Sequence, residues 1–199
     1  MNLDETNTRR NEQTLTKKVL DFWIGEEGSE IYGTNRKEWF VKDPDFDNQI
    51  REKFSEDVKI VIDGGYGRMA ENQMGCLALV ILLDQFPRNI FRDTEMAFAG
   101  DRRALSLANE AVRQGFDQDL PLSSQMFFYL PFEHSESLDD QKRCMDLFDV
   151  AGNDEMMKWA IAHRDIIARF GRFPHRNAAL GRESTAEELA FLKGQNSSF

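Results

Sequence analysis

The sequence predicts an all-α protein. Nearly every apolar pattern in it repeats at intervals of three or four residues, which is the period of a helix. Capping residues, glycines and prolines stand at the ends of these patterns, where helices begin and stop. The length of 199 residues suits one domain, and 41% hydrophobic with 30% charged residues suits a soluble globule. We expect a single domain of about eight helices.

The N-terminal part is expected to contain two helices behind a flexible arm. Residues 1–13 are polar, which predicts a disordered arm before a first helix that starts at Thr14. Asp43 is placed to cap a second helix, whose apolar residues recur every four positions through residues 46–62. Gly64 is expected to end this helix.

The most apolar segment of the chain, residues 76–83, is expected to lie at the centre of the domain. It belongs to a predicted helix over about residues 69–85, which Pro87 is expected to stop. Asp93 or Thr94 is then expected to cap the next helix.

The bounds of the remaining helices are predicted from residues that cap or end helices. A short apolar helix over residues 121–129, a long helix over residues 153–170 and a last helix ending near Leu192 are expected. The residues expected to cap or end helices in this half are Gly115, Pro131, Ser137, Asn153, Gly171 and either Ser184 or Thr185. We therefore expect one all-α domain over residues 14–193 and a flexible tail over residues 194–199.

The charge balance disfavours general binding to nucleic acid. Lys and Arg number 25 against 35 Asp and Glu, a net charge of −10, whereas coating nucleic acid needs a cationic surface that releases counterions. The longest apolar run, residues 76–83, is far shorter than the ~20 residues of a membrane span. Residues 1–13 lack the hydrophobic stretch of a secretion signal, so a cytoplasmic location is expected. The oligomeric state stays open.

Neither a metal nor a cofactor is expected. The two cysteines are too few for a disulfide framework and lack zinc-site spacing. The HExxH metal motif and the GxxxxGK[ST] phosphate loop are both absent. Glu133, His134, His163 and His175 are metal-binding residue types, but they show no metal-binding spacing.

Arginine placement is the most informative charge feature. Between residues 164 and 182 there are five arginines and one acid, Asp165, and Arg88 and Arg92 form a second basic group. Arginine presents a planar, permanently charged fork that suits carboxylates and phosphates. These arginines indicate either an anion-binding site or ion pairs with acids on a solvated surface.

The histidines form a second set of candidates. His163 interrupts the apolar stripe of its predicted helix, so its ring must be hydrogen-bonded or stay neutral. A satisfied core histidine and a proton-transferring group both fit this position. His134, which follows Glu133, and His175 lie just after prolines at predicted helix ends, where a rigid scaffold presents loop side chains.

Three long blocks of the sequence resemble the signature blocks of a bacterial family known as domain of unknown function 924. The matching segments are Asp84–Arg92, Phe128–Glu136 and Arg169–Asn177, with Val19–Trp23 and Trp39-Phe40 near the start. The resemblance spans roughly residues 15–193. It implies a single all-α domain built from helical hairpins, related to tetratricopeptide-like folds. Because the family has no established activity, the resemblance implies no catalytic residues.

Each block mixes Phe-Pro packing with polar residues at a predicted helix end, so we hypothesise that the three ends converge on one pocket. The expected ligand-binding residues are Arg88, Asn89, Arg92, Arg172, His175, Arg176 and Asn177, the arginines as anion clamps and the asparagines as orienting groups. The residues expected to position a proton are Glu133, His134 and His163, with His175 as a further choice.

Two classes of function fit this hypothesis. The favoured class is binding without turnover, in which an arginine- and histidine-lined pocket holds a small anionic molecule or a peptide carboxylate. The alternative is an enzyme on a small phosphorylated or carboxylated substrate, with a histidine as general acid or base. A deep pocket with His163 beside Glu133 favours the enzyme, and a long open groove favours a peptide.

Overall fold

The computed structural model describes residues 3–194, and its regular elements within that range are all helical. The all-α prediction is therefore confirmed for the described part of the chain. The α-helices, in chain order, are α1 (Leu3–Trp23), α2 (Pro44–Ile62), α3 (Gln73–Val80), α4 (Phe86–Ile90), α5 (Asp101–Gln114), α6 (Leu122–Glu133), α7 (Leu138–Ala151), α8 (Asp154–Phe170) and α9 (Ala186–Phe191).

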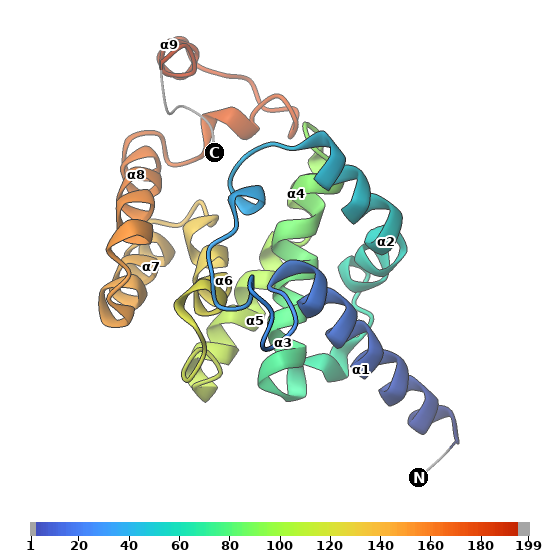
Figure 1. Ribbon diagram of the computed structural model, residues 1–199. Coiled ribbons are helices and arrows are strands. Elements are labelled where there is room, and N and C mark those ends of the chain that lie inside the picture. The colour runs from blue at the N-terminus through green and yellow to red at the C-terminus, as the bar shows by residue number, and fades with distance from the viewer. Residues whose placement is uncertain (1–2, 195–199) are drawn as a thin grey trace.

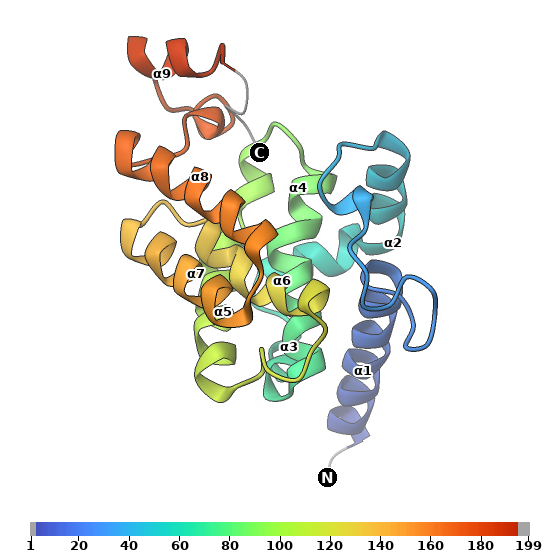
Figure 2. The ribbon, with the colours of Figure 1, turned by 60° about the vertical axis from the view of Figure 1, so that its left-hand side comes forward.

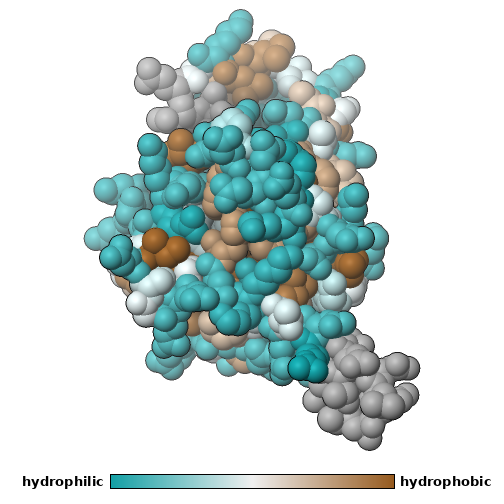
Figure 3. Space-filling model, turned by 45° about the vertical axis from the view of Figure 1, so that its right-hand side comes forward, coloured by the Kyte–Doolittle hydropathy of each residue, from teal (hydrophilic) through white to brown (hydrophobic). Residues whose placement is uncertain are grey.

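Helices α3 and α4 run through the middle of the molecule, with α1 and α2 on one side and α6, α7 and α8 on the other (Figures 1 and 2). The successive helices α5, α6, α7 and α8 each pack against the next. This order agrees with helices joined by short connections, whereas the tetratricopeptide-like arrangement stays a prediction. The face in Figure 3 is mostly hydrophilic, with apolar residues in small separate areas. Within residues 3–194, none of the helices combines the length and the hydropathy of a membrane-spanning segment.

The disordered arm expected over residues 1–13 is wrong for residues 3–13, which belong to α1. This segment is polar but contains neither glycine nor proline, so nothing in it breaks a helix that continues into the buried part of α1. Residues 1–2 and 195–199 lie outside the described residues. Helix α2 starts as predicted, because the Asp43 side chain accepts hydrogen bonds from the backbone of its first turn.

The central helix does not stop at Pro87. The chain continues from α3 through a π-helical turn, Ile81–Gln85, into α4, which contains Pro87. In a regular α-helix the proline ring meets the carbonyl four residues earlier, that of Leu83. The π turn widens the helix just before the proline, and the Leu83 carbonyl faces Gly100 closely. The expected burial of residues 76–83 is observed.

Helix α5 starts later than predicted. Asp93 and Thr94 do not cap it; Thr94 instead precedes a 3-10 turn, and Gly100 is the N-cap residue. A Cβ atom at Gly100 would overlap the backbone of Leu83, so only glycine lets the start of α5 approach the π turn this closely. This contact places Asp101, the first residue of α5, beside α4.

Helix α6 also passes through its proline. Pro131 was expected to end it, but α6 continues to Glu133. The residues from Met126 to Glu133 are all buried, so packing on every side outweighs the lost backbone hydrogen bond. The result is that Glu133 and His134 are carried into the interior. The predicted caps that are confirmed are Gly115, Ser137, Asn153, Gly171 and Thr185.

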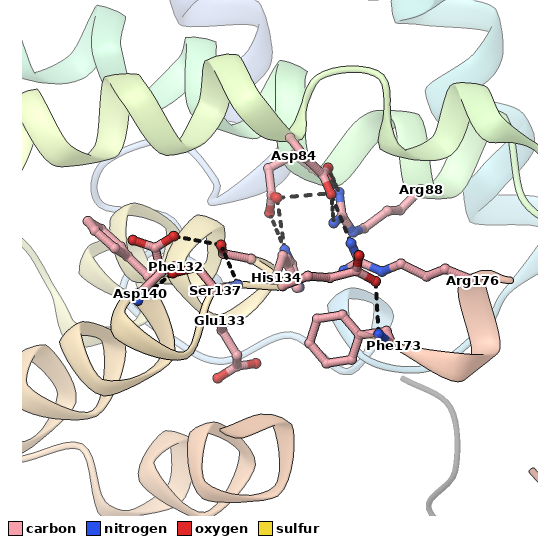
Figure 4. A network of polar contacts seen from close by, with 12 residues as sticks. Asp84, Arg88, Phe132, Glu133, His134, Ser137, Asp140, Phe173 and Arg176 are labelled. Carbon is pink, nitrogen blue, oxygen red and sulfur yellow. Dashed lines mark hydrogen bonds and ion pairs between the residues drawn. The ribbon is translucent and has the colours of Figure 1, made fainter. Parts of the chain in front are cut away.

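Residues 171–194 form a separate C-terminal segment at one end of the molecule (Figure 1). It rests on a small apolar cluster of its own, in which Phe173 packs with Ile166 and Ile167 of α8. Residues Pro174–Arg176 of this segment form a 3-10 turn. This turn faces the ends of α4 and α6 (Figure 4).

Candidate functional site

A network of charged side chains joins the ends of three helices to the C-terminal segment (Figure 4). It consists of Asp84 from the π turn, Arg88 from α4, Asp101 from α5, His134 at the end of α6, and Arg176. The three sequence blocks thus each contribute to one cluster, which we call the Arg-His cluster.

Asp84 and His134 form a buried dyad. His134 Nδ1 lies 2.8 and 2.9 Å from the two carboxylate oxygens of Asp84. Gln85 Nε2 donates a further hydrogen bond of 2.6 Å to this carboxylate. Burial alone raises the pKa of Asp84, but the charge of Arg88 and the hydrogen bonds from His134 and Gln85 overcome this effect and hold the pKa well below its usual range. Asp84 is therefore an ionised acceptor that fixes the imidazole ring.

Arg88 and Arg176 meet at one carboxylate, that of Asp101. The two terminal nitrogens of Arg88 lie 2.8 and 3.0 Å from the two oxygens of Asp101. Arg176 Nη1 reaches one of the same oxygens at 3.2 Å. Two guanidinium groups that are 88 positions apart in the sequence, at residues 88 and 176, are thus brought together.

Arg176 is held in a fixed orientation by two aromatic rings. Its guanidinium carbon lies 4.8 Å from the ring centre of Phe98 and 4.5 Å from that of Phe173. Its Nε atom is buried and has no hydrogen-bond partner among the described residues. Burial and the positive charge of Arg88 lower the pKa of Arg176 to about 10. The group still carries its charge at neutral pH.

All three histidines of the chain lie at this cluster. The His163 ring centre is 6.3 Å from that of His134 and 5.6 Å from that of Phe173, which is in turn 5.6 Å from His175. Burial lowers the pKa of His163 to about 3 and that of His175 to about 4, helped by neighbouring positive groups. Both rings are therefore neutral at neutral pH.

Glu133 lies beside His163, as one sequence-based interpretation required. Glu133 is 3% exposed, and its Oε1 lies 3.4 Å from His163 Nδ1. The same nitrogen donates to the Trp159 carbonyl at 2.9 Å, which matches a neutral imidazole. Burial and the negative charge of Asp84 raise the pKa of Glu133 to about 8. At neutral pH the carboxyl group is therefore mostly protonated, and it can act as a proton donor.

Four predicted ligand-binding residues lie outside the cluster. Arg92 and Asn89 both bond to Asp47 of α2, with Arg92 at 2.6 and 2.8 Å. Arg172 bonds to Glu188 of α9 at 2.6 and 2.8 Å, and Asn177 donates to Ser184. The ion-pair interpretation thus accounts for Arg92 and Arg172, which join elements of the fold.

The sequence patterns did not predict Asp101, Phe98 or Glu136 as site residues. Asp101 follows Gly100, and a glycine before an acid at a helix start was the available signal, although it is a weak one. Glu136 lies in a recognised block, and it accepts hydrogen bonds from Arg182 and from the Phe173 backbone. It fastens the C-terminal segment that supplies Arg176.

The described residues contain no group of three or more His, Cys, Asp or Glu side chains arranged to hold a metal ion.

A family model described as "Bacterial protein of unknown function (DUF924)" matches residues 19–196 of the chain. The chain belongs to this family. The resemblance seen in the sequence is confirmed, and four of the five residues in the Arg-His cluster of this DUF924 protein, all but Asp101, come from the blocks that carried it.

The DUF924 fold recurs in a solved structure, that of a protein of unknown function from Agrobacterium tumefaciens. The two chains are 39% identical, and their structures agree with a TM-score of 0.82 over 92% of this chain and 99% of the other. No curated protein matches the sequence. The comparisons thus confirm the fold and family of this DUF924 protein and assign no activity to it.

Proposed function

We propose that the protein binds a small anion, with a carboxylate or phosphate group, at Arg88 and Arg176. The observation that carries the proposal is the state of Arg176. Two phenylalanine rings hold its guanidinium group in place. Among the described residues, however, only Asp101 accepts a hydrogen bond from this group. A fixed cation with open donors is prepared for an anion, because its ordering entropy is already lost before binding.

The donor count supports the proposal. A guanidinium group has five N–H donors in a fixed fork. Arg88 uses three of them on Asp101 and the Asp84 carbonyl, and Arg176 uses one on Asp101. Both groups contact the Asp101 carboxylate, so together they already bind one oxyanion of the protein itself. Asp101 therefore marks a position that suits an oxyanion.

The site is open to solvent at one edge. The side chains of Arg88 and Asp101 are 20% and 23% exposed, while that of Arg176 is 7% exposed. The two positive charges are balanced by the carboxylates of Asp84 and Asp101. Binding therefore rests on oriented N–H donors in a partly buried place rather than on excess charge, and small anions suit it better than large ones.

A second candidate function, acid–base catalysis on the bound anion, is favoured by the Asp84–His134 dyad. A carboxylate bonded to Nδ1 orients a neutral imidazole so that Nε2 can accept a proton. His134 lies beside the two arginines, so a group attached to the anion would come within its reach. In hydrolysis of para-nitrophenyl phosphate, water would attack phosphorus, His134 Nε2 would take a proton from that water, and para-nitrophenolate would leave. We expect the wild type but not His134→Gln to release phosphate and para-nitrophenolate. No release by the wild type contradicts this candidate.

Calorimetric titration with inorganic phosphate and with succinate tests the binding proposal. We expect the wild type to bind one of these anions and Arg176→Gln to lose at least about tenfold in affinity, the loss typical of a removed charged hydrogen bond. Arg92→Gln is the matched control, because Arg92 also bonds to an aspartate, the buried Asp47, but lies outside the cluster. Its affinity should equal that of the wild type.

Absence of binding of both anions to folded wild-type protein would overturn the proposal. Equal affinities of Arg176→Gln and Arg92→Gln would do so as well, since the anion would then lie elsewhere. Circular dichroism of each variant establishes that it is folded before titration.

A further inference from the structure

We infer that His134 makes this site selective for anions that carry their own hydrogen-bond donor, such as hydrogen phosphate, over anions that carry none, such as sulfate. The inference rests on the proposed anion binding at Arg88 and Arg176. It adds the chemical class of the ligand, an acidic oxyanion with at least one O–H group.

The first step is the position of the ring proton. The Asp84 carboxylate accepts a hydrogen bond from Gln85 at 2.6 Å and faces Arg88 Nη1 at 3.3 Å. An ionised carboxylate has no proton to give, so the His134 nitrogen bonded to it must be the donor. Nδ1 of His134 therefore carries the ring proton, and Nε2 of the neutral ring carries only a lone pair.

The second step is that the ring stays neutral. Arg88, Arg176 and the His163 ring face His134, and among the described residues the negative charge that acts on His134 most strongly is that of Asp84. Burial and the Arg88 charge lower the pKa of His134, and Asp84 does not fully offset them. A second proton on Nε2 is thus disfavoured at neutral pH, and Nε2 acts as an acceptor.

The third step is that this acceptor is available. No described residue forms a hydrogen bond with Nε2, and the side chain is 15% exposed. The Arg-His cluster therefore offers a ligand two kinds of contact: N–H donors from two arginines and one lone pair from His134. Hydrogen phosphate satisfies both, because it has charged oxygens and an O–H group.

Sulfate is the matched probe, because it has the same tetrahedral shape but no proton at neutral pH. Bound at the arginines, it would place an oxygen lone pair against the lone pair of Nε2. A site built around a hydrogen bond strongly rejects an analogue that lacks the required partner, because the buried group is then left unpaired. Asp84 is the positioning residue in this scheme, since it decides which nitrogen carries the proton.

The experiment compares the affinities of inorganic phosphate and sodium sulfate at neutral pH by calorimetric titration. We expect the wild type to bind phosphate at least about tenfold more tightly than sulfate. His134→Phe keeps an aromatic ring at this position but removes the acceptor nitrogen Nε2. The affinities for phosphate and sulfate should therefore become nearly equal, while phosphate still binds. Arg92→Gln is the control and should keep the wild-type ratio.

Asp84→Asn tests whether Asp84 decides which nitrogen of His134 carries the ring proton. In this variant the amide oxygen can take the position of Asp84 Oδ2, where it accepts from Gln85 Nε2 at 2.6 Å. The NH2 group then takes the position of Oδ1, which lies 2.8 Å from His134 Nδ1 and 3.3 Å from Arg88 Nη1, and it donates to His134. The ring proton then moves to Nε2, which becomes a donor, and the preference should shift toward sulfate. Because Asp84 is fully buried, its substitution can prevent folding, so a second measurement uses the wild type. Nitrogen NMR of the His134 ring shows which nitrogen carries the proton. We expect the proton on Nδ1, and a proton on Nε2 would overturn the inference.

The two proposals fail in different ways. If neither anion binds the wild type, the proposed function is wrong, and the selectivity falls with it. If both anions bind with similar affinities, and His134→Phe leaves their ratio unchanged, the inference is wrong while the anion site stands.

Discussion

At the residue scale, the Arg-His cluster holds ionisable groups in unusual protonation states. Burial raises the pKa of Glu133 to about 8 and lowers that of His163 to about 3, so both groups are mostly neutral at neutral pH. Such opposite shifts in neighbouring groups are typical of sites that move protons. They also have a cost in stability, because the folded state binds a different number of protons from the unfolded chain.

Glu133 should make the protein less stable as the pH rises. Its folded-state pKa of about 8 lies above its unfolded value of 4.5, so the folded protein binds more protons between these values. The free energy of unfolding therefore falls with rising pH through this window, by on the order of a few kcal/mol. Glu133→Gln should remove much of this fall, as measured by urea unfolding at about pH 5 and about pH 9.

The control for this prediction is Glu187→Gln, which changes an exposed glutamate on α9. It should leave the pH dependence of the unfolding free energy as in the wild type. If Glu133→Gln behaves in the same way, Glu133 is not protonated in the folded protein.

At the scale of elements, the contact between the π turn and the start of α5 sets the geometry of the cluster. The π turn contains Asp84, and α5 begins with Asp101, so both carboxylates depend on the approach of Gly100 to Leu83. The π turn thus helps to bring the carboxylates of Asp84 and Asp101 within reach of Arg88. π turns in other proteins are frequent at functional sites for related reasons.

Gly100→Ala should disturb this contact. The added Cβ would overlap the Leu83 backbone, and a forced shift in a packed interior costs about 1–3 kcal/mol of unfolding free energy. Gly67→Ala is the matched control, because a Cβ there meets open space and the backbone has no positive φ. Urea unfolding should show a lower midpoint for Gly100→Ala only; equal midpoints for the two variants would contradict the proposed close approach.

Local sequence signals predicted most helix ends, whereas the helix ends predicted at Pro87 and Pro131 were wrong. Caps such as Asn153 and Thr185 act within one turn, so their effect can be read from neighbouring residues. The helices continue through Pro87 and Pro131 because of burial and a π turn, which depend on residues far away in the sequence. The candidate site shows the same division: residue types indicated Arg88, Arg176 and the histidines, but their partner Asp101 comes from tertiary packing.

At the scale of the whole molecule, the C-terminal segment supplies Arg176 and is held by charged contacts as well as by the apolar cluster around Phe173. Arg182 bonds to Glu136 at 2.7 and 2.9 Å, and Glu136 also accepts a hydrogen bond from the Phe173 backbone. Arg172 makes a similar pair with Glu188 inside the segment. Glu136 therefore links this segment to the end of α6, where His134 lies.

Glu136→Gln should loosen residues 171–194 without unfolding the central helices. The change weakens the bonds to Arg182 and Phe173, so backbone amides of this segment should exchange with deuterium faster while those of α3 keep their protection. Asp165→Asn is the control, because it removes an exposed partner of Arg164. Unchanged exchange in residues 171–194 would show that apolar contacts alone hold the segment.

The position of Arg176 in the chain also has a consequence for synthesis. The main core is made of residues from Leu15 to Ala160, whereas Arg176 follows all of them. The ribosome adds Asp84, Arg88, Asp101, His134 and His163 before it adds Arg176, which carries the second guanidinium group. A nascent chain can therefore bury most of its interior first, and the proposed anion site is complete only once Arg176 has been added.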